Sequence, residues 1–176
     1  MKRSFATATS SDAAELAALH CAVSEHLTRQ YGQGRWSSAQ TERGVLNDLR
    51  KPKFSRILMA RRGARIVATL RLATKKPWAI DTAYFTPAKR PLYLTSMAVH
   101  PDIQRGGVGR LLLKEAEAMA QAWPADAIRL DAFDAEAGAG NFYSKCGFRE
   151  VARVKYKGNP LIYFELVLPG VAMDAK

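Results

Sequence analysis

The segment SMAVHPDIQRGGVGRLLLKEAEAMA, residues 96–120, carries the residue types best suited to binding an anion. An apolar run ends at Pro101, a glycine-rich loop follows with Gly106, Gly107 and Gly109, and an amphipathic helical pattern begins directly after it. The first N–H groups of a helix have no intrahelical acceptor and lie at the positive end of the helix dipole. Because glycine has no Cβ, a phosphate can approach such N–H groups closely. The segment therefore predicts a phosphate site, with a simple tight turn as the alternative.

The amino-acid sequence of this loop differs from those of other phosphate-binding motifs. It lacks the Gly-Lys-Ser/Thr of nucleoside-triphosphate loops, and residues 100–104 separate its glycines from the preceding strand, which fits a dinucleotide fingerprint poorly. The pattern that remains is Gln-x-x-Gly-x-Gly, formed by Gln104, Gly107 and Gly109. A second motif, NFYSKCGF, follows at residues 141–148.

In this order, the two motifs resemble the acetyl-coenzyme A loop and the second signature of the GNAT superfamily of N-acetyltransferases, and together they cover residues 93–148. The resemblance implies an enzyme that transfers the acetyl group of its co-substrate acetyl-coenzyme A to a primary amine by direct attack. It also implies an α/β, single-domain GNAT-like fold. Its mixed, mostly antiparallel sheet would be splayed at the cofactor strands and flanked by about four helices.

The resemblance assigns cofactor binding to one strand and the loop after it. Residues 93–99 would hydrogen-bond the pantetheine arm from a bulged strand, and the N–H of Val99 would polarise the thioester carbonyl as an oxyanion donor. The pyrophosphate would lie on the N–H groups of residues 104–110. The expected cofactor-binding residues are Met97, Ala98, Val99, Gln104, Arg105, Gly106, Gly107, Val108, Gly109 and Arg110.

The resemblance also assigns a catalytic role to Tyr143 within NFYSKCGF. Its hydroxyl would protonate the departing thiolate as a general acid, and the alternative is a core tyrosine. The family often places an asparagine earlier on this helix, but the corresponding position lies near Glu136, so that pantetheine contact is not predicted.

The general base cannot be read from the sequence. An amine of pKa near ~10 must lose a proton before or during its attack, to a carboxylate, a histidine or a water chain. Glu42, Asp81 and His100 are candidates, and for each of them a structural role is the alternative. No metal site is indicated, since neither Cys21 nor Cys146 stands in a CxxC or Cys/His cluster, and we expect both to be buried free thiols.

Aromatic residues in two segments could form the wall of an acceptor pocket. The resemblance places the acceptor against residues 30–50 and 75–93, the second of which is a long loop rich in proline. Packing of the loops is the alternative role for these rings. The expected substrate-binding residues are Trp36, Trp78, Tyr84 and Tyr93.

The net charge of +11 is unevenly distributed along the chain. Residues 1–91 carry 17 lysines and arginines against six acidic residues, whereas residues 92–176 carry ten against ten. A basic face suits an anionic partner or simply keeps a protein in solution. If residues 1–91 hold the acceptor, polycations are poor guests, and we expect a small neutral or acidic amine or a peptide N-terminus with acidic neighbours.

Other functions stay open. One is a protein N-terminal or lysine acetyltransferase, and another, of a different class, is a non-catalytic acyl-coenzyme A sensor or nucleic-acid-binding module. No nucleic-acid motif is present, so nucleic acid is not expected as a partner. The acceptor, the acyl-chain length and the oligomeric state, a homodimer included, are not determined by the sequence.

The remaining pattern predicts one N-acetyltransferase domain over residues 1–176, with an acceptor-side half at about 1–91 and a cofactor-binding core at about 92–150. No segment has the length and hydrophobicity of a membrane span, and we expect a soluble cytoplasmic protein. Periodicity and capping residues predict helices at 10–32, 38–51, 108–123 and 135–147, and strands at 3–9, 54–62, 65–74, 92–99, 127–133, 148–156 and 160–168.

Overall fold

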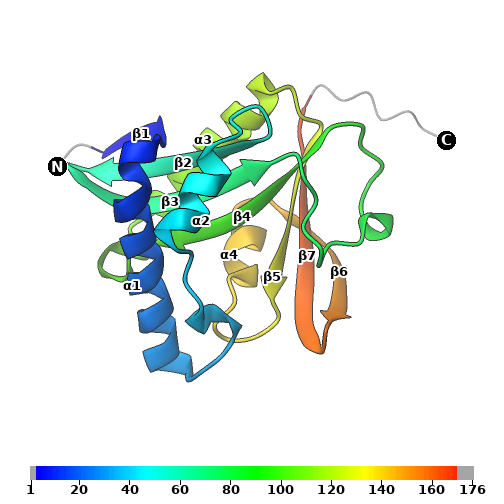
Figure 1. The fold of residues 1–176 in the computed structure, drawn as a ribbon. Helices are drawn as coiled ribbons and strands as arrows, with labels where there is room; N and C mark the ends of the chain where they lie inside the picture. The colour runs from blue at the N-terminus through cyan, green and yellow to red at the C-terminus, as the bar shows by residue number, and fades with distance from the viewer. Residues whose placement is uncertain (1–2, 170–176) are drawn as a thin grey trace. The chain divides into compact units, whose positions relative to one another are not determined.

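The computed structural model describes residues 3–169. Its strands form a seven-stranded, mostly antiparallel sheet in the order β1-β2-β3-β4-β5-β7-β6 (Figure 1). The chain divides into two compact units, which are described separately. The first contains the residues up to Ala73 together with Leu94–Ala116, and the second contains Thr74–Tyr93 and the residues from Glu117 onward.

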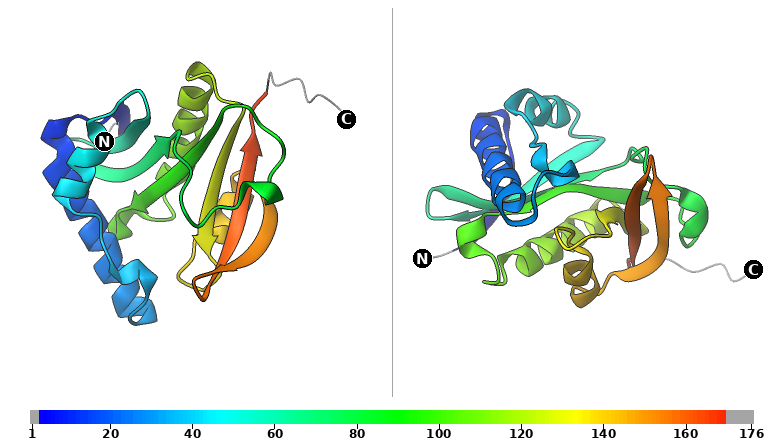
Figure 2. Two further views of the ribbon diagram at one scale, coloured as in Figure 1. Left: turned by 45° about the vertical axis from the view of Figure 1, so that its right-hand side comes forward. Right: turned by 90° about the horizontal axis from the view of Figure 1, so that it is seen from below.

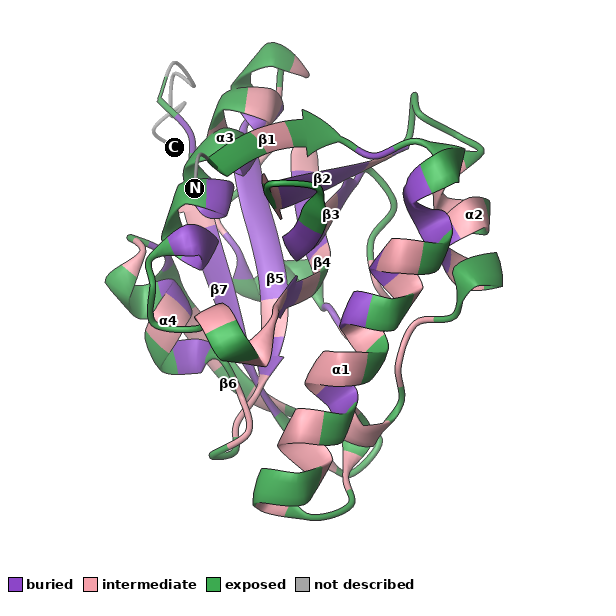
Figure 3. Cartoon of the chain, turned by 90° about the vertical axis from the view of Figure 1, so that its left-hand side faces the viewer, coloured by how far each residue is buried: buried purple, intermediate pink, exposed green. Residues whose placement is uncertain are grey.

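The first unit packs two helices against an antiparallel arrangement of strands. Leu16 and Leu19 of α1, Val45 of α2, and Met59 and Ile66 of the strands share one buried cluster. Figure 3 colours the buried residues of these elements purple. Each such side chain contributes roughly 1.5–3 kcal/mol on burial. The elements are β1 (Arg3–Thr7), α1 (Ala13–Tyr31), α2 (Glu42–Leu49), β2 (Ser55–Arg62) and β3 (Arg65–Ala73), with most of β4 (Pro91–Val99) and the start of α3 (Val108–Ala122).

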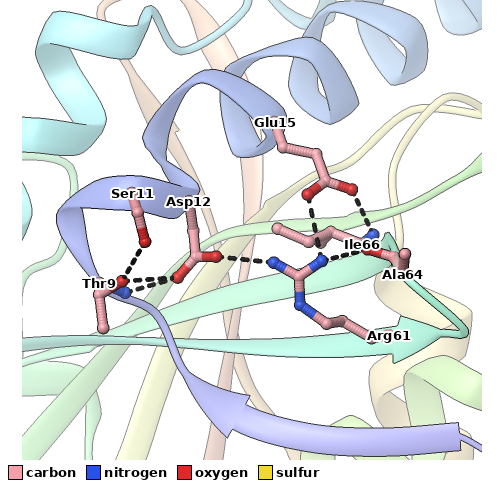
Figure 4. A network of polar contacts seen from close by, with 7 residues as sticks. All are labelled: Thr9, Ser11, Asp12, Glu15, Arg61, Ala64 and Ile66. Carbon is pink, nitrogen blue, oxygen red and sulfur yellow. Dashed lines mark hydrogen bonds and ion pairs between the residues drawn. The ribbon is translucent and has the colours of Figure 1, made fainter.

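A polar network fixes the start of α1 on the β2–β3 hairpin (Figure 4). Arg61 donates to Asp12 at 2.7 Å and to Glu15 at 3.2 Å. The carboxylate of Asp12 also accepts from the N–H of Thr9 at 2.8 Å, and Glu15 accepts from the N–H of Ile66 at 2.6 Å. Burial alone would raise the pKa of Asp12, but the hydrogen bonds from Thr9 and Arg61 outweigh it and lower that pKa.

Strand β4 is irregular at its centre. Ser96 has a φ of 53°, in the left-handed region that non-glycine residues seldom occupy. Such a residue bends a strand and re-aims its side chains, which agrees with the bulge implied by the family resemblance. The parallel pairing of β4 with β5 runs from Pro91↔Ala127 to Tyr93↔Arg129.

The second unit is built around β7, which lies between β5 and β6. Gly140 of α4 lies so close to Ile162 and Phe164 that a Cβ there would be 3.3–3.4 Å from both side chains. Tyr163 and Glu165 alternate with these residues and contact the loop of residues 74–90, so α4 and the loop cover opposite faces of β7. Its elements are β5 (Ala127–Phe133), α4 (Gly140–Lys145), β6 (Arg149–Tyr156) and β7 (Asn159–Val167).

The long loop before β4 is tied down by buried ionic groups. Glu165, only 1% exposed, pairs with Arg129 and accepts from the N–H of Thr86. Arg129 in turn donates to the carbonyl of Thr86 at 2.5 Å, and its guanidinium lies 4.9 Å from the ring centre of Phe85. Figure 2 shows this loop running beside β6 and β7. The loop is therefore a fixed wall of the second unit.

The predicted order of elements is confirmed, and two helix starts differ from the prediction. Helix α2 begins at Glu42 because Thr41 is its N-cap, with its hydroxyl accepting from the N–H of Gly44 at 3.1 Å. Helix α4 begins at Gly140, and Gly138 precedes it in a turn where a Cβ would lie 1.9 Å from the carbonyl oxygen of Phe133. The predicted start of this helix at residue 135 was therefore wrong.

The expectation that both cysteines are buried was also wrong. Cys21 is exposed on α1, where its Sγ donates to Glu25 at 3.4 Å, and Cys146 is half-buried. Within residues 3–169, no helix is both long and apolar enough to cross a membrane.

Candidate functional site

The glycine-rich loop adopts a conformation that requires glycine at one position and small size at another. Gly107 has a φ of 76°, and Arg105 also has a positive φ, of 65°. A Cβ on Gly106 would lie 3.1 Å from the carbonyl oxygen of Ile103. Arg3 ties the loop to β1 by donating to the carbonyl of Gly106 at 3.0 Å. The chain thus turns tightly before entering α3 at Val108.

This geometry fits a phosphate-bearing ligand. The first intrahelical hydrogen bond of α3 runs from the N–H of Leu111 to the carbonyl of Gly107. Helix geometry leaves the earlier N–H groups, those of Val108 and Gly109 among them, without an intrahelical acceptor. Positions 106, 107 and 109 are glycines, so no side chain at these positions keeps an anion from the positive end of the 15-residue helix.

The end of β4 presents its last N–H on the edge away from β3. His100 donates its N–H to Val67 of β3 at 2.8 Å. Because successive N–H groups of an extended chain alternate in direction, the N–H of Val99 points to the opposite edge. On that edge the side-chain amide of Gln104 donates to the Val99 carbonyl at 3.1 Å. The Gln104 side chain therefore holds the end of the strand against the glycine-rich loop.

Tyr143 lies in an aromatic cluster on the α4 side of the second unit. It is 5% exposed, and its ring lies 5.7 Å from that of Phe148 and 5.9 Å from that of Phe164. Burial, followed by the charges of Asp131 and Cys146, raises the pKa of its hydroxyl well above the usual range. The hydroxyl therefore stays protonated at neutral pH.

The structure brings two of the predicted aromatic residues to one pocket. A pocket of about 390 Å³ lies between the long loop and β6, and we call it the loop pocket. Trp78 is 84% exposed and Tyr84 is 52% exposed at its wall. The remaining lining residues are Lys76, Ala79, Ile80, Asp81, Thr82, Val154, Lys155, Tyr156 and Tyr163.

The other two predicted substrate-binding residues lie elsewhere. Tyr93 is buried in a cluster with Ile80, Phe85 and Tyr163. Trp36 belongs to the first unit, where its indole N–H donates to the carbonyl of Gly32 at 2.9 Å. The position of Tyr93 matches the packing role that the sequence left as the alternative, and substrate binding by Trp36 stays a prediction.

Each candidate base named from the sequence has a structural task or an exposed position. Asp81 accepts from the N–H of Ala83 at 3.0 Å and caps a short 3-10 helix. His100 accepts from the N–H of Asp102 and lies against Arg65. Glu42 is exposed in the first turn of α2.

Sequence reasoning missed the residues that the sheet brings to this region. Tyr163 on β7 lines the loop pocket, where its hydroxyl donates to the carbonyl of Ala79 and accepts from the N–H of Asp81. Asp131 lies directly across from Tyr163 on β5. Alternation along the strands predicts which residues share a face, but the pairing register that joins them is a tertiary property.

The comparisons agree with this arrangement. The model of the acetyltransferase (GNAT) family matches residues 21–148. Among curated proteins, none matches the sequence significantly.

Solved structures with the same fold cover nearly the whole chain. The PaiA N-acetyltransferase of Thermoplasma acidophilum, in complex with coenzyme A, is 14% identical, with a TM-score of 0.70 over 93% of this chain and 98% of that one. The ribosomal-protein-S18-alanine N-acetyltransferase of Escherichia coli is 14% identical, with a TM-score of 0.70 and 99% of both chains covered. YncA of Salmonella typhimurium, with its cofactor acetyl-CoA, is 18% identical, with a TM-score of 0.68 and 99% of both chains covered.

The fold and the glycine-rich loop define an acyltransferase. The family model spans most of the chain, so this protein belongs to the GNAT acetyltransferase family, and acetyl-coenzyme A is its co-substrate.

Proposed function

We propose that the protein is an N-acetyltransferase that acts on a small neutral or acidic primary amine bound in the loop pocket. The observation that carries the proposal is the composition of this pocket. Exposed Trp78 and Tyr84 offer ring faces, and the lysines at positions 76 and 155 outnumber the single carboxylate of Asp81. A local excess of positive charge repels polycations and favours an acceptor that carries a carboxylate.

The co-substrate supplies an acetyl group activated as a thioester. We assign its pyrophosphate to the N–H groups of residues 104–110, where α3 begins, and its pantetheine arm to Met97, Ala98 and Val99. The N–H of Val99, on the edge away from β3, would donate to the carbonyl oxygen of the thioester.

Tyr143 is assigned the role of general acid. Its buried, protonated hydroxyl would give its proton to the departing sulfur. Arg105 and Arg110 flank the glycines of the loop and would add positive charge beside the phosphates.

The test is a panel of amines supplied with acetyl-coenzyme A, in which transfer is read by release of the free thiol. The panel contains amino acids, dipeptides with acidic and neutral side chains, peptide N-termini, lysine peptides and polyamines. We expect turnover with a small acidic or neutral amine, and loss of at least tenfold in kcat/KM when Trp78 is replaced by alanine. Turnover confined to long peptides would favour a protein acetyltransferase. Tight coenzyme A binding without any transfer would favour a non-catalytic sensor.

A further inference from the structure

Asp131 is a half-buried carboxylate that lacks a cationic partner. Among residues 3–169, no arginine, lysine or histidine forms an ion pair with it, whereas the buried carboxylates of Asp126 and Glu165 each pair with arginine. Burial raises the pKa of Asp131, and a bond to its own backbone N–H offsets the effect only in part. An unpaired carboxylate in a core element is costly, so a task in the reaction is the natural explanation for it.

The position of Asp131 joins the loop pocket to Tyr143. Asp131 pairs in register with Tyr163, and directly opposite residues of an antiparallel pair share a face. This is also the face on which Arg129 meets the long loop. Burial and, after it, the charge of Asp131 raise the pKa of both Tyr163, in the wall of the pocket, and Tyr143.

Asp131 and Tyr143 approach β5 and β7 from opposite faces. Tyr143 packs against Phe164, which alternates on β7 with Tyr163. Asp131 thus shares a face with Tyr163 of the loop pocket, and Tyr143 lies on the α4 face. A base and an acid held on opposite faces cannot neutralise each other directly.

We propose that Asp131 is the general base of the transfer and takes the first proton from the ammonium group of the acceptor. This inference rests on the proposed function. The charge of Asp131 acts on Tyr163 of β7, which Asp81 of the loop also faces, and on Tyr143 of α4, which Cys146 also faces. Arg129 and Glu165, on the same face of the two strands, pair with each other.

The proton and bond changes balance without a further reactant. Asp131 takes one proton from the ammonium nitrogen, and the freed electron pair forms the new C–N bond to the acetyl carbon. As the C–S bond breaks, Tyr143 gives its proton to the sulfur, and the nitrogen returns a proton to Tyr143. Asp131 releases its proton to water, so one proton leaves per acetyl group transferred.

The experiment compares Asp131→Asn, Asp131→Glu and the control Asp134→Asn. Asp134 lies just after β5 and holds Arg153 at the surface, so its amide variant controls for the loss of a carboxylate nearby. The probe is the panel amine with the highest rate of transfer. At neutral pH we expect Asp131→Asn to lower kcat/KM by about 10²-fold or more, Asp131→Glu to restore part of the rate, and Asp134→Asn to act like the wild type.

The pH profile separates a base from a structural carboxylate. Below the pKa of the amine, the concentration of free amine rises about tenfold per pH unit. The loss of kcat/KM in Asp131→Asn relative to the wild type should therefore shrink about tenfold per pH unit. A second readout is the carboxyl carbon resonance of Asp131, followed by NMR and assigned by its absence in Asp131→Asn. We expect its titration midpoint to coincide with the acidic limb of the wild-type kcat/KM profile.

The outcomes are distinct. An active wild type with an unchanged rate and pH profile in Asp131→Asn overturns the assignment of the base and leaves the proposed function intact. A deficit that stays constant with pH also overturns it, because the carboxylate would then act through structure. If the folded wild type transfers to no amine of the panel, the proposed function itself fails.

Discussion

The hydroxyl of Tyr143 lies in surroundings that keep it protonated. Phe142, Phe148 and Phe164 enclose the ring, and burial with the nearby charge of Asp131 raises the pKa of the hydroxyl. A protonated hydroxyl is what a general acid requires, but the same surroundings also describe a tyrosine of the core. Only a variant that removes the oxygen and keeps the ring distinguishes the two roles.

We expect Tyr143→Phe to lower kcat by about 10²- to 10⁴-fold with nearly unchanged KM values, because the packing ring stays and only the proton donor is lost. Steady-state kinetics and thermal unfolding measure the effect. The matched control is Tyr31→Phe at the end of α1, where the hydroxyl accepts from Gln30. A lower melting temperature with normal turnover would identify Tyr143 as a core residue.

The ionised carboxylate of Asp12 contributes to the stability of the first unit. Its pKa is lowered in the folded state, so the stabilisation is fully present above the unfolded pKa of about 3.9 and is lost as pH falls through the folded pKa. We expect Asp12→Asn to lower the free energy of unfolding by about 1–3 kcal/mol at neutral pH.

Urea unfolding between neutral pH and pH 3 measures this prediction. The difference between wild type and Asp12→Asn should narrow toward acid, because the wild-type carboxylate becomes protonated there. Asp102→Asn is the control, since the Asp102 side chain is 72% exposed. An equal loss of stability at every pH would show that Asp12 acts without its charge.

At the scale of elements, the loop before α3 has the backbone conformation that glycine provides. Gly107 has a positive φ, and a Cβ there would meet no atom within 4 Å. The glycine therefore serves the turn and leaves the space in front of the helix N–H groups open. Placing a branched side chain in the left-handed region costs roughly 1–2 kcal/mol, and the side chain would enter that space.

We expect Gly107→Val to raise the dissociation constant of coenzyme A at least tenfold, equivalent to about 1.4 kcal/mol. Isothermal titration calorimetry measures the change. Gly158→Val is the matched control, because Gly158 has a φ of 79° and equally open surroundings in the β6–β7 turn. If both variants fold and bind coenzyme A equally well, the pyrophosphate does not lie on this loop.

At the scale of the whole molecule, the excess positive charge is divided less unevenly between the two units than between the halves of the sequence. Residues 3–73 and 94–116 carry 15 lysines and arginines against seven acidic residues, while residues 74–93 and 117–169 carry ten against eight. The unit with the larger excess also contains the glycine-rich loop. The sequence analysis connected the positive charge of residues 1–91 with binding of the acceptor. Part of that charge lies in the same unit as the proposed phosphate site.

We expect spermidine and aminoglycosides to be poorer acceptors than a neutral amine of similar size, because the loop pocket carries Lys76 and Lys155 against Asp81. The effect is measured as the ratio of the kcat/KM of the neutral amine to that of the polycation, at low and at high salt. This ratio should be smaller at high salt, because salt screens the repulsion. A polycation that ranks first in the panel would contradict the charge argument.

The sequence by itself determined the family, the order of the elements and the glycine-rich loop, because these depend on local spacing: caps, periodicity and residues without a Cβ. It did not place Tyr163 in the loop pocket, pair Arg129 with Glu165, or bring Asp131 within electrostatic reach of Tyr143. Those relations depend on strand register and on the face that each residue presents, and a shift of one residue would reverse every face. Trp36 and Tyr93 show the converse. Their aromatic side chains suggested the wall of a pocket, but in the structure Trp36 donates to the carbonyl of Gly32 and Tyr93 lies in a buried cluster. The sequence determines which chemical groups each segment carries, whereas the tertiary structure determines the neighbours that change the pKa and the contacts of those groups.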